Sequence, residues 1–434
     1  MPSHFISIAP SRSNRRSGSI PTMYVLVTHI PILTSGTECY VDASWHRDLM
    51  LARDWLAAPM GQLKLVSPSM PLSARRSDVM AVERIDNIPG ITALPSIDVR
   101  LSARKFWLQQ RSRWLHDVNH ALDGATVLHT ADWAIFKPIT FMAHAAAVSR
   151  RIPTVFIGPD MDPHVTLSRS VRSSFYLAAF DHFMRRAARD TNLLLLKEGL
   201  VYDRYSKYNA NAHAICHSMH SRDDVIDEQH LSARLCSLEQ KRPLKAVYAG
   251  RFVPRKGVSN GIAAIALAKR QGQRVEYHLF GGGPEEANLR QQVSDLEVDD
   301  LVFFHGFAEY GSAFMAKLAE FDFFLFMPTE EDTPRALYDT MAAGLPFVGT
   351  AIPFMEKRLE TDGAGILVKV LDVQGAARQL ARLSENRSEL IELSQLAREA
   401  GLKHSVEQWY RRRADWTTTA VASAAANRKS RCTP

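Results

Sequence analysis

The most constraining feature of this sequence is a regular alternation of short apolar runs and amphipathic segments in its second half. Strands that are buried on both faces of a parallel sheet give continuous apolar runs of this kind. The alternation therefore predicts an α/β layer with a largely parallel sheet. We expect strands at residues 246–249, 275–280, 301–305, 323–327 and 347–350, and helices at 259–271, 285–296, 311–320 and 333–343.

The first half carries the same alternation less regularly, and a charged, proline-containing segment at 239–243 separates the halves. Such a segment is typical of a linker. We predict a disordered basic tail at 1–22, a first Rossmann-like lobe at 23–238, a second at 239–405, and a C-terminal helix with a loose tail at 406–434 that packs back on the first lobe. In the first lobe we expect strands at 24–30, 63–67, 125–129, 154–157 and 214–216, and helices at 103–122 and 173–188.

Composition excludes several classes of protein. The 434 residues are 46% hydrophobic and 23% charged, which suits two lobes with substantial cores. Four scattered cysteines without C-x-x-C spacing argue against a disulfide framework or zinc site and favour the cytoplasm. The sequence has no run of about 18 apolar residues, which a membrane span would need. Residues 1–22 lack the apolar centre of a signal peptide, and Met23 is an alternative start.

The formal net charge of +7 comes from short basic clusters without interleaved aromatic residues. This pattern disfavours a nucleic-acid-binding protein. It leaves peripheral contact with the anionic inner face of a membrane as an expectation.

The first stretch with chemical potential follows the predicted strand 246–249. Gly250 allows a turn and a close approach of a ligand to the backbone. Arg251 offers a planar fork of donors and Lys256 a compact charge, and together they suit a diphosphate. The alternative is a turn with two surface cations. A second turn, at 281–284, joins the next strand and helix; its glycines bind an anion through backbone N–H groups or simply permit the turn, and the turn alone is the simpler reading.

The third stretch, residues 327–346, places two carboxylates around the start of a predicted helix. Thr333 has the character of an N-cap, with Pro334 at the first helical position and Gly344 after the end. Glu331 would then lie just before the helix and Asp339 within it. The two acids could line one ligand site, or Glu331 could simply complement the helix dipole.

In this order the three stretches resemble the retaining glycosyltransferases of the GT-B fold, also described as glycosyl transferases group 1 or glycosyltransferase family 4. That family has a Gly-Arg…Lys-Gly stretch, a Gly-x-Gly-Pro turn, and a Glu-x7-Glu motif that runs into Ala-Met-Ala-x-Gly-x-Pro. The counterparts here are residues 250–257, 281–284 and 331–346, and His305 matches a family strand end. The likeness is specific over about residues 245–400 and general in the first lobe.

The resemblance implies transfer of a hexose-type unit from a nucleoside diphosphate sugar to a glycan or glycolipid acceptor. The family does this with retention of configuration and without a metal ion or other cofactor. Arg251 and Lys256 would hold the diphosphate, Glu331 the hydroxyls of the transferred sugar, and Asp339 the ribose. The remaining donor-site residues that the resemblance implies are Gly250, Gly282, His305, Thr333 and Arg335.

The sequence departs from the family at several positions. Asp339 replaces the second Glu and is one methylene shorter. Residues 332–334 replace the common Gly-Phe-Gly, so that Asp332 stands near the diphosphate; we expect its side chain to point away or to pair with Arg335. The family histidine after strand 154–157 is missing, and Asp160 or His129 is the candidate to replace it as a catalytic residue.

These departures leave an alternative open, in which the protein binds a nucleotide sugar or a partner without turnover. Another two-lobed enzyme, such as a sugar-nucleotide epimerase, would place its acidic and basic residues at other spacings.

Overall fold

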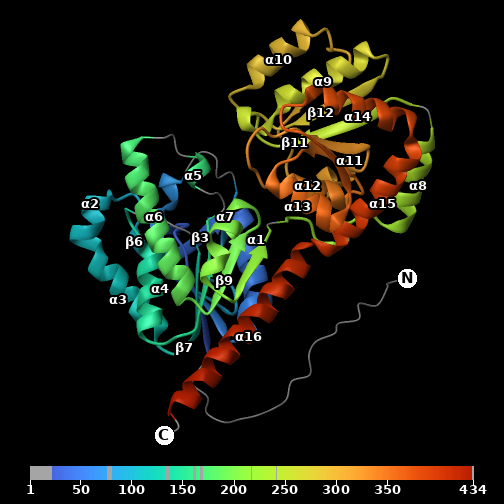
Figure 1. The fold of residues 1–434 in the computed structure, drawn as a ribbon. Helices are drawn as coiled ribbons and strands as arrows, with labels where there is room; N and C mark the ends of the chain where they lie inside the picture. Colours follow the sequence, from blue (N-terminus) through green and yellow to red (C-terminus); the bar gives the residue numbers. More distant parts are fainter. Residues whose placement is uncertain are drawn as a thin grey trace.

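The computed structural model describes residues 22–75, 81–131, 136–159, 163–166, 170–216, 218–240 and 242–432. Within these ranges the chain forms two lobes, each built on a predominantly parallel sheet with helices packed against it (Figure 1). The predicted architecture of two Rossmann-like α/β lobes is confirmed.

The first sheet has the strand order β10-β9-β8-β7-β1-β4-β2-β3-β5, with β6 paired to β4 beside this path. Among the described strands, the pairs β2–β3 and β3–β5 are antiparallel and the others are parallel. The strands are β1 (Met23–Val27), β2 (Ile32–Ser35), β3 (Glu38–Asp42), β4 (Gln62–Pro71), β5 (Val82–Arg84), β6 (Ile91–Asp98), β7 (Ala125–Ala131), β8 (Thr154–Ile157), β9 (Leu193–Lys197) and β10 (Ala212–Ile215).

The helices of the first lobe include the two that were predicted. Residues 103–122 form one continuous helical segment with a π-helical middle, and residues 173–188 lie within α6. The bounds are α1 (Ala43–Leu51), η1 (Ala52–Ala57), α2 (Ala103–Lys105), η3 (Phe106–Gln110), α3 (Arg111–Leu122), α4 (Ile139–Ser149), α5 (Pro163–Thr166), α6 (Val171–Asp190) and α7 (Leu200–Tyr205).

The second sheet is entirely parallel among its described strands, in the order β13-β12-β11-β14-β15-β16. The second lobe contains every strand and helix that was predicted for residues 246–350, and the observed ends differ from the predicted ends by at most two residues. Its strands are β11 (Leu244–Ala249), β12 (Val275–Phe280), β13 (Val302–Gly306), β14 (Phe323–Phe326), β15 (Phe347–Thr350) and β16 (Gly365–Val368). Its helices are α9 (Val258–Arg270), α10 (Glu286–Asp295), α11 (Ser312–Leu318), α12 (Arg335–Ala342), α13 (Pro353–Asp362), α14 (Val373–Glu385) and α15 (Arg387–Lys403).

Helix α8 (Glu228–Glu239) precedes the expected lobe boundary but packs on the second lobe. Leu238 belongs to the core of that lobe, and the guanidinium of Arg234 donates to the carbonyl oxygens of Phe321 and Asp322. Just after α8, Arg242 forms a bidentate pair with the carboxylate of Asp322 at 2.7 Å. The segment that was predicted as a linker is therefore anchored to the second lobe.

The last helix, α16 (Val406–Cys432), runs from the second lobe along the first, as Figure 1 shows. Val406 and Tyr410 are part of the first lobe's core, and the Tyr410 hydroxyl donates to the backbone oxygen of Asp48 at 3.2 Å. The ring of Trp416 stacks on His213 with centroids 4.2 Å apart. These contacts agree with the predicted packing of the C-terminal helix. Among the described residues, no helix has both the length and the apolar character of a membrane span.

The chain thus passes between the lobes twice, once before α8 and once at the start of α16, and the two passages lie side by side. The backbone N–H of Val406 donates to the carbonyl oxygen of His220 at 3.0 Å, and that of Arg222 donates to the carboxylate of Glu407 at 3.0 Å. These contacts tie the two passages together at one place.

A buried ion pair also joins the lobes. Arg358 of α13 contacts Glu198 of the first lobe at 2.6 Å and Asp362 at 3.0 Å, and its side chain is 5% exposed. His404 also lies within 3.0 Å of this guanidinium. The pair fixes the carboxyl end of β9, which Glu198 directly follows, against α13.

Candidate donor-binding site

A cavity of about 650 Å³ opens at the carboxyl ends of β11 and β12 and the start of α12. Cavities of this size hold ligands as large as a nucleotide. It brings together six of the residues that were predicted for the donor site: Gly250, Arg251, Lys256, Gly282, Arg335 and Asp339. Glu331, Thr333 and His305 lie outside its lining.

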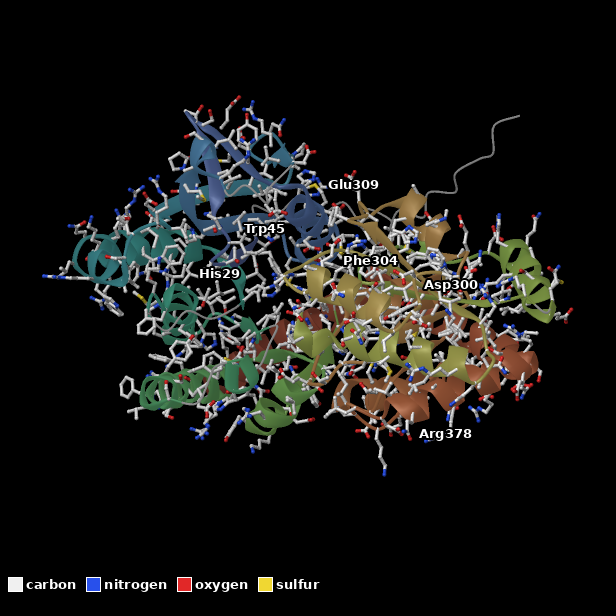
Figure 2. The ribbon with its side chains drawn as sticks, turned by 90° about the horizontal axis from the view of Figure 1, so that it is seen from above. His29, Trp45, Asp300, Phe304, Glu309 and Arg378 are labelled. Atoms are coloured by element: carbon white, nitrogen blue, oxygen red, sulfur yellow. The ribbon has the colours of Figure 1, made fainter. Side chains whose placement is uncertain are left out.

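Aromatic residues close another side of this cavity. Phe307, Tyr310 and Phe280 line it together with Met219 from the passage between the lobes. In Figure 2 the labelled Phe304 marks β13 and Glu309 the loop after it, on the side of the second lobe that lies nearer Trp45 of the first. The guanidinium of Arg47, in the same helix as Trp45, lies 6.0 Å from the Tyr310 ring centroid. The loop that lines this side of the cavity therefore lies against the first lobe.

The two glycine turns lie against each other. Gly250 has a φ of 156° and donates its N–H to the carbonyl oxygen of Phe280 at 2.9 Å. Gly281 has a φ of 128°, and a Cβ there would lie 2.0 Å from the carbonyl oxygen of Gly250. Because the Gly281 N–H already donates to Gly306 at 2.7 Å, it is not free for an anion. The Gly281 N–H therefore belongs to the packing of the turns, whereas Gly282 lines the cavity.

Lys256 ends a single 3₁₀ turn, η6 (Pro254–Lys256), and its ammonium is already paired. Nζ lies 2.6 Å from Oδ2 of Asp332 and 5.6 Å from the ring centroid of Phe326. The same carboxylate oxygen lies 3.2 Å from Nη1 of Arg255. Burial lowers the pKa of Lys256, while the nearby Asp332 raises it. The expected pairing of Asp332 with Arg335 is wrong, because Arg335 directs Nη1 to the sulfur of Met219 at 3.2 Å. The other expectation, that Asp332 points away from the cavity, agrees with its absence from the cavity lining.

Asp339 reaches the cavity from the buried face of α12 and is 5% exposed. Its Oδ1 lies 3.6 Å from Nδ1 of His220. Neither atom has a hydrogen-bond partner among the described residues. His220 directs Nε2 to the carbonyl oxygen of Gly401 at 2.8 Å, and since a carbonyl only accepts, that nitrogen carries the hydrogen. Asp339 thus keeps acceptor capacity that a ligand hydroxyl could use.

Glu331 lies at the boundary with the first lobe. Its Oε2 accepts from the N–H of Phe354 at 3.5 Å, and Oε1 is so close to Gly199 that a Cβ there would lie 2.4 Å from it. Burial raises the pKa of Glu331 to about 7, partly offset by the N–H groups of Phe354 and Leu200. The structure therefore separates Glu331 from Asp339: one acid faces α7 of the first lobe and the other faces the cavity.

Comparison with known proteins identifies the segment that carries this cavity. Residues 236–403 match the family described as Glycosyl transferases group 1. The putative colanic acid biosynthesis glycosyltransferase WcaL of Escherichia coli (strain K12) is 31% identical over 173 residues, an alignment that covers 38% of this chain and 42% of WcaL. The amylovoran biosynthesis glycosyltransferase AmsK of Erwinia amylovora is 30% identical over 164 residues, or 36% of this chain and 40% of AmsK. The aligned part thus spans about two fifths of these relatives.

Solved structures extend the likeness to both lobes. HepE of Anabaena in complex with UDP superposes with a TM-score of 0.60 at 13% identity, covering 92% of this chain and 100% of HepE. The lipopolysaccharide glycosyltransferase WaaG gives 0.57 at 13% identity, covering 91% and 99%. The two-lobed architecture is therefore the GT-B fold, as the resemblance implied.

Two of the predicted donor-site residues, Thr333 and His305, do not line the cavity. Helix α12 begins at Arg335 and its N-cap is Pro334, so Thr333 is not the N-cap. That prediction is wrong by one residue, because the ring of Pro334 holds an extended conformation just before the helix. His305 stacks on Phe280 with centroids 4.5 Å apart, and its Nε2 lies 2.9 Å from Nδ1 of His278. His305 thus packs against Phe280, which lines the cavity. Burial lowers the pKa of His305.

The end of α12 agrees with the prediction. Gly344 follows the helix with a φ of 76° and donates its N–H to Met341 at 2.9 Å. This glycine ends the helix before β15.

A second, smaller cavity of about 150 Å³ lies in the first lobe, beneath α16. His129 of β7 lines it and is buried, with Nδ1 hydrogen-bonded to the hydroxyl of Tyr24. Its Nε2 has no partner among the described residues, and burial holds its pKa well below the usual range. Asp48, Ser218 and Arg413 also line this cavity. The other predicted catalytic residue of this lobe, Asp160, lies outside the described residues.

The sequence alone did not reveal Met219, Asp48 or Arg413 as parts of these cavities, nor His220 as the neighbour of Asp339. They come from the passage between the lobes, α1 and α16, which carry no motif. The described residues contain no group of three or more His, Cys, Asp or Glu side chains that could hold a metal ion.

Proposed function

We propose that this protein is a retaining glycosyltransferase of glycosyltransferase family 4, which moves a hexose-type unit from a nucleoside diphosphate sugar to a glycan or glycolipid acceptor. The observation that carries the proposal is the convergence of Arg251, Lys256 and Asp339 on one cavity at the carboxyl edge of a parallel sheet. The names of WcaL and AmsK, which are glycosyltransferases of polysaccharide biosynthesis, support the reaction class. The HepE complex with UDP supports a nucleotide donor.

In this proposal the diphosphate lies beside Arg251 and Lys256, and Gly250 allows the backbone to approach it. The nucleobase packs against Phe307 and Tyr310, and Asp339 accepts from the ribose hydroxyls. When the bond to the sugar breaks, negative charge grows on the departing diphosphate, and fixed positive charge there lowers the barrier. Two protein cations would supply this charge without a metal ion.

The transferred sugar would extend from the diphosphate toward the first lobe. Glu331 directly precedes Asp332, the partner of Lys256, and touches Gly199 across the lobe boundary. This location suits a contact with sugar hydroxyls when the cleft is occupied. In this proposal the acceptor binds at the smaller cavity, which His129 and Asp48 line. Ser218 of the smaller cavity directly precedes Met219 of the larger one, so the chain leads from one cavity to the other.

A surface of the first lobe supports peripheral contact with a membrane. Residues 99–116 contain five Arg or Lys and no Asp or Glu. We define the aromatic–cationic surface as the exposed side chains of Arg104, Lys105, Trp107, Leu108, Arg111, Phe136 and Phe175. Trp107 donates to the carbonyl oxygen of Phe136 at 3.1 Å, and the Phe136 ring centroid lies 5.8 Å from that of Tyr176, the residue next to Phe175. Apolar and cationic side chains together favour an anionic lipid surface.

The proposal is tested by incubating the protein with a panel of nucleotide sugars. We expect one of them to raise the melting temperature and to be hydrolysed slowly in the absence of an acceptor, because a ligand that binds only the native state stabilises it. The anomeric configuration of a transferred sugar, read by NMR, tests retention. Tight binding without hydrolysis or transfer to any acceptor pool would instead favour the alternative, a protein that binds a nucleotide sugar without turnover.

A further inference from the structure

Asp332 is the ion-pair partner of Lys256, the buried cation that lines the cavity. It lies in the loop between β14 and α12, and its side chain is 9% exposed. Its Oδ2 lies 2.6 Å from Nζ of Lys256, whose side chain is 15% exposed. In the unliganded protein, the ammonium that would meet a diphosphate is thus already neutralised by a carboxylate of the same chain.

The pair is held in place by the backbone. The N–H of Thr329 donates to the carbonyl oxygen of Arg255 at 3.0 Å, which fastens the loop before Asp332 to the turn that carries Lys256. A Cβ on Gly257 would lie 1.6 Å from the carbonyl oxygen of Met327, so the same turn and loop approach each other as closely as a glycine allows. The contact between Asp332 and Lys256 is therefore built into the junction of two loops.

Asp332 has a second cationic partner. Nη1 of Arg255 lies 3.2 Å from the same Oδ2, so the carboxylate would keep a counter-charge if Lys256 turned away. Lys256 in turn would exchange one anion for another if it turned to a phosphate. An exchange of this kind leaves no buried charge unpaired, which would otherwise be costly.

From this arrangement we infer that Asp332 is an internal counter-ion that competes with the donor diphosphate for Lys256, and that it thereby weakens the binding of donor and nucleoside diphosphate product. This inference rests on the proposed function. Asp332 acts through Lys256 and is a positioning residue. Competition of this kind keeps the product from being retained, since the carboxylate returns to the ammonium as the diphosphate leaves.

The decisive variant is Asp332→Asn, which keeps the shape of the side chain and removes its charge. We expect it to lower the Kd for the cognate nucleoside diphosphate about tenfold, because a like charge beside a bound anion is removed. The KM for the donor sugar should fall as well, while kcat stays the same or decreases because the product leaves more slowly. Binding is measured by calorimetry with UDP, GDP and ADP.

Two matched variants control for other effects. Glu330→Gln removes a negative charge from an exposed position in the same loop and should leave the Kd within about twofold of wild type, since exposed charges are screened. Asp332→Glu keeps the charge and should stay close to wild type in affinity. Circular dichroism and thermal melting show that each variant is folded before binding is compared.

The outcomes separate the inference from the function on which it rests. If wild type binds one of the diphosphates and Asp332→Asn binds it equally or more weakly, Asp332 supports the site and the inference is overturned. If Glu330→Gln tightens binding as much as Asp332→Asn, the effect is general electrostatics and the inference also fails. If neither wild type nor any variant binds UDP, GDP or ADP, the proposed function fails instead.

Discussion

Oδ1 of Asp339 faces Nδ1 of His220 across 3.6 Å, and both side chains are buried. Asp339 belongs to the second lobe, whereas His220 lies in the passage between the lobes. The acid that is proposed to hold the ribose therefore lies next to the segment that connects the lobes. The sequence around neither residue indicates that the two side chains meet.

Asp339→Asn should weaken binding of the cognate nucleoside diphosphate about tenfold, because hydrogen bonds to an ionised acceptor are stronger than those to an amide. Binding of inorganic pyrophosphate, which has no ribose, should be unchanged. Calorimetry with both ligands measures the difference. An equal loss for the two ligands would show that Asp339 acts on the diphosphate or on the fold.

Lys256→Ala should reduce transfer at least about 100-fold while the protein remains folded, because one fixed positive charge at the leaving group is lost. Donor turnover is measured beside a circular dichroism spectrum. Arg270→Ala, which removes a cation from the exposed end of α9, serves as the control. Unchanged activity of Lys256→Ala would remove the diphosphate assignment.

The raised pKa of Glu331 predicts a pH-dependent stability. The unfolded chain ionises this carboxyl near its ordinary pKa of 4.5, whereas burial in the folded protein raises the pKa to about 7. The folded state binds this proton more tightly, so its stability falls as the pH rises through this interval. Glu331→Gln should melt like wild type near pH 4 and at a higher temperature than wild type near pH 8. A melting difference that is the same at both pH values would contradict this account.

Arg358→Leu should destabilise the protein by about 3 kcal/mol, because it leaves the buried carboxylate of Glu198 without its cation, while Asp362 keeps Lys403. The free energy of unfolding is obtained from denaturant titration. Arg378→Leu, on the exposed face of α14 and labelled in Figure 2, should change it by less than about 1 kcal/mol. Similar losses in the two variants would mean that the contact between the lobes adds little.

The aromatic–cationic surface should direct the protein to anionic vesicles. Leu108 is 73% exposed and Phe175 80% exposed, and replacing both by Ser should abolish co-sedimentation with vesicles that contain phosphatidylglycerol. Wild-type binding should weaken at high salt and be absent with phosphatidylcholine alone. Leu371→Asn, at an exposed position of the second lobe, is the control. If the double variant still sediments, the surface has another role; a change in its oligomeric state would point to contact with a second copy.

The second lobe could be predicted closely from the sequence because its strands are buried parallel strands that end at glycine turns. Strands 275–280 and 347–350 have the predicted bounds. The first lobe has strands that this pattern does not reveal: β6 contains Pro95, which disfavours a strand, and β2 and β3 form a short hairpin around Gly36.

The site could be predicted only in part, because some of its contacts join segments that are far apart in the sequence. Residue types and spacing pointed to Arg251, Lys256 and Asp339, which meet in one cavity. They could not show that Asp332 pairs with Lys256, since the two positions are far apart in the sequence and approach only through the packing of two loops. Likewise, α8 was placed in the first lobe because Pro243 marks a break in composition, whereas its packing follows from Arg234 and Leu238.

The two passages between the lobes meet at the hydrogen bond from Val406 to His220. The ion pair of Arg358 with Glu198 holds the lobes together at a second place. His220 belongs to the first of these junctions and also faces Asp339. A nucleotide that binds Asp339 would therefore lie next to the segment that connects the lobes, so filling the cavity and positioning the two lobes would be linked.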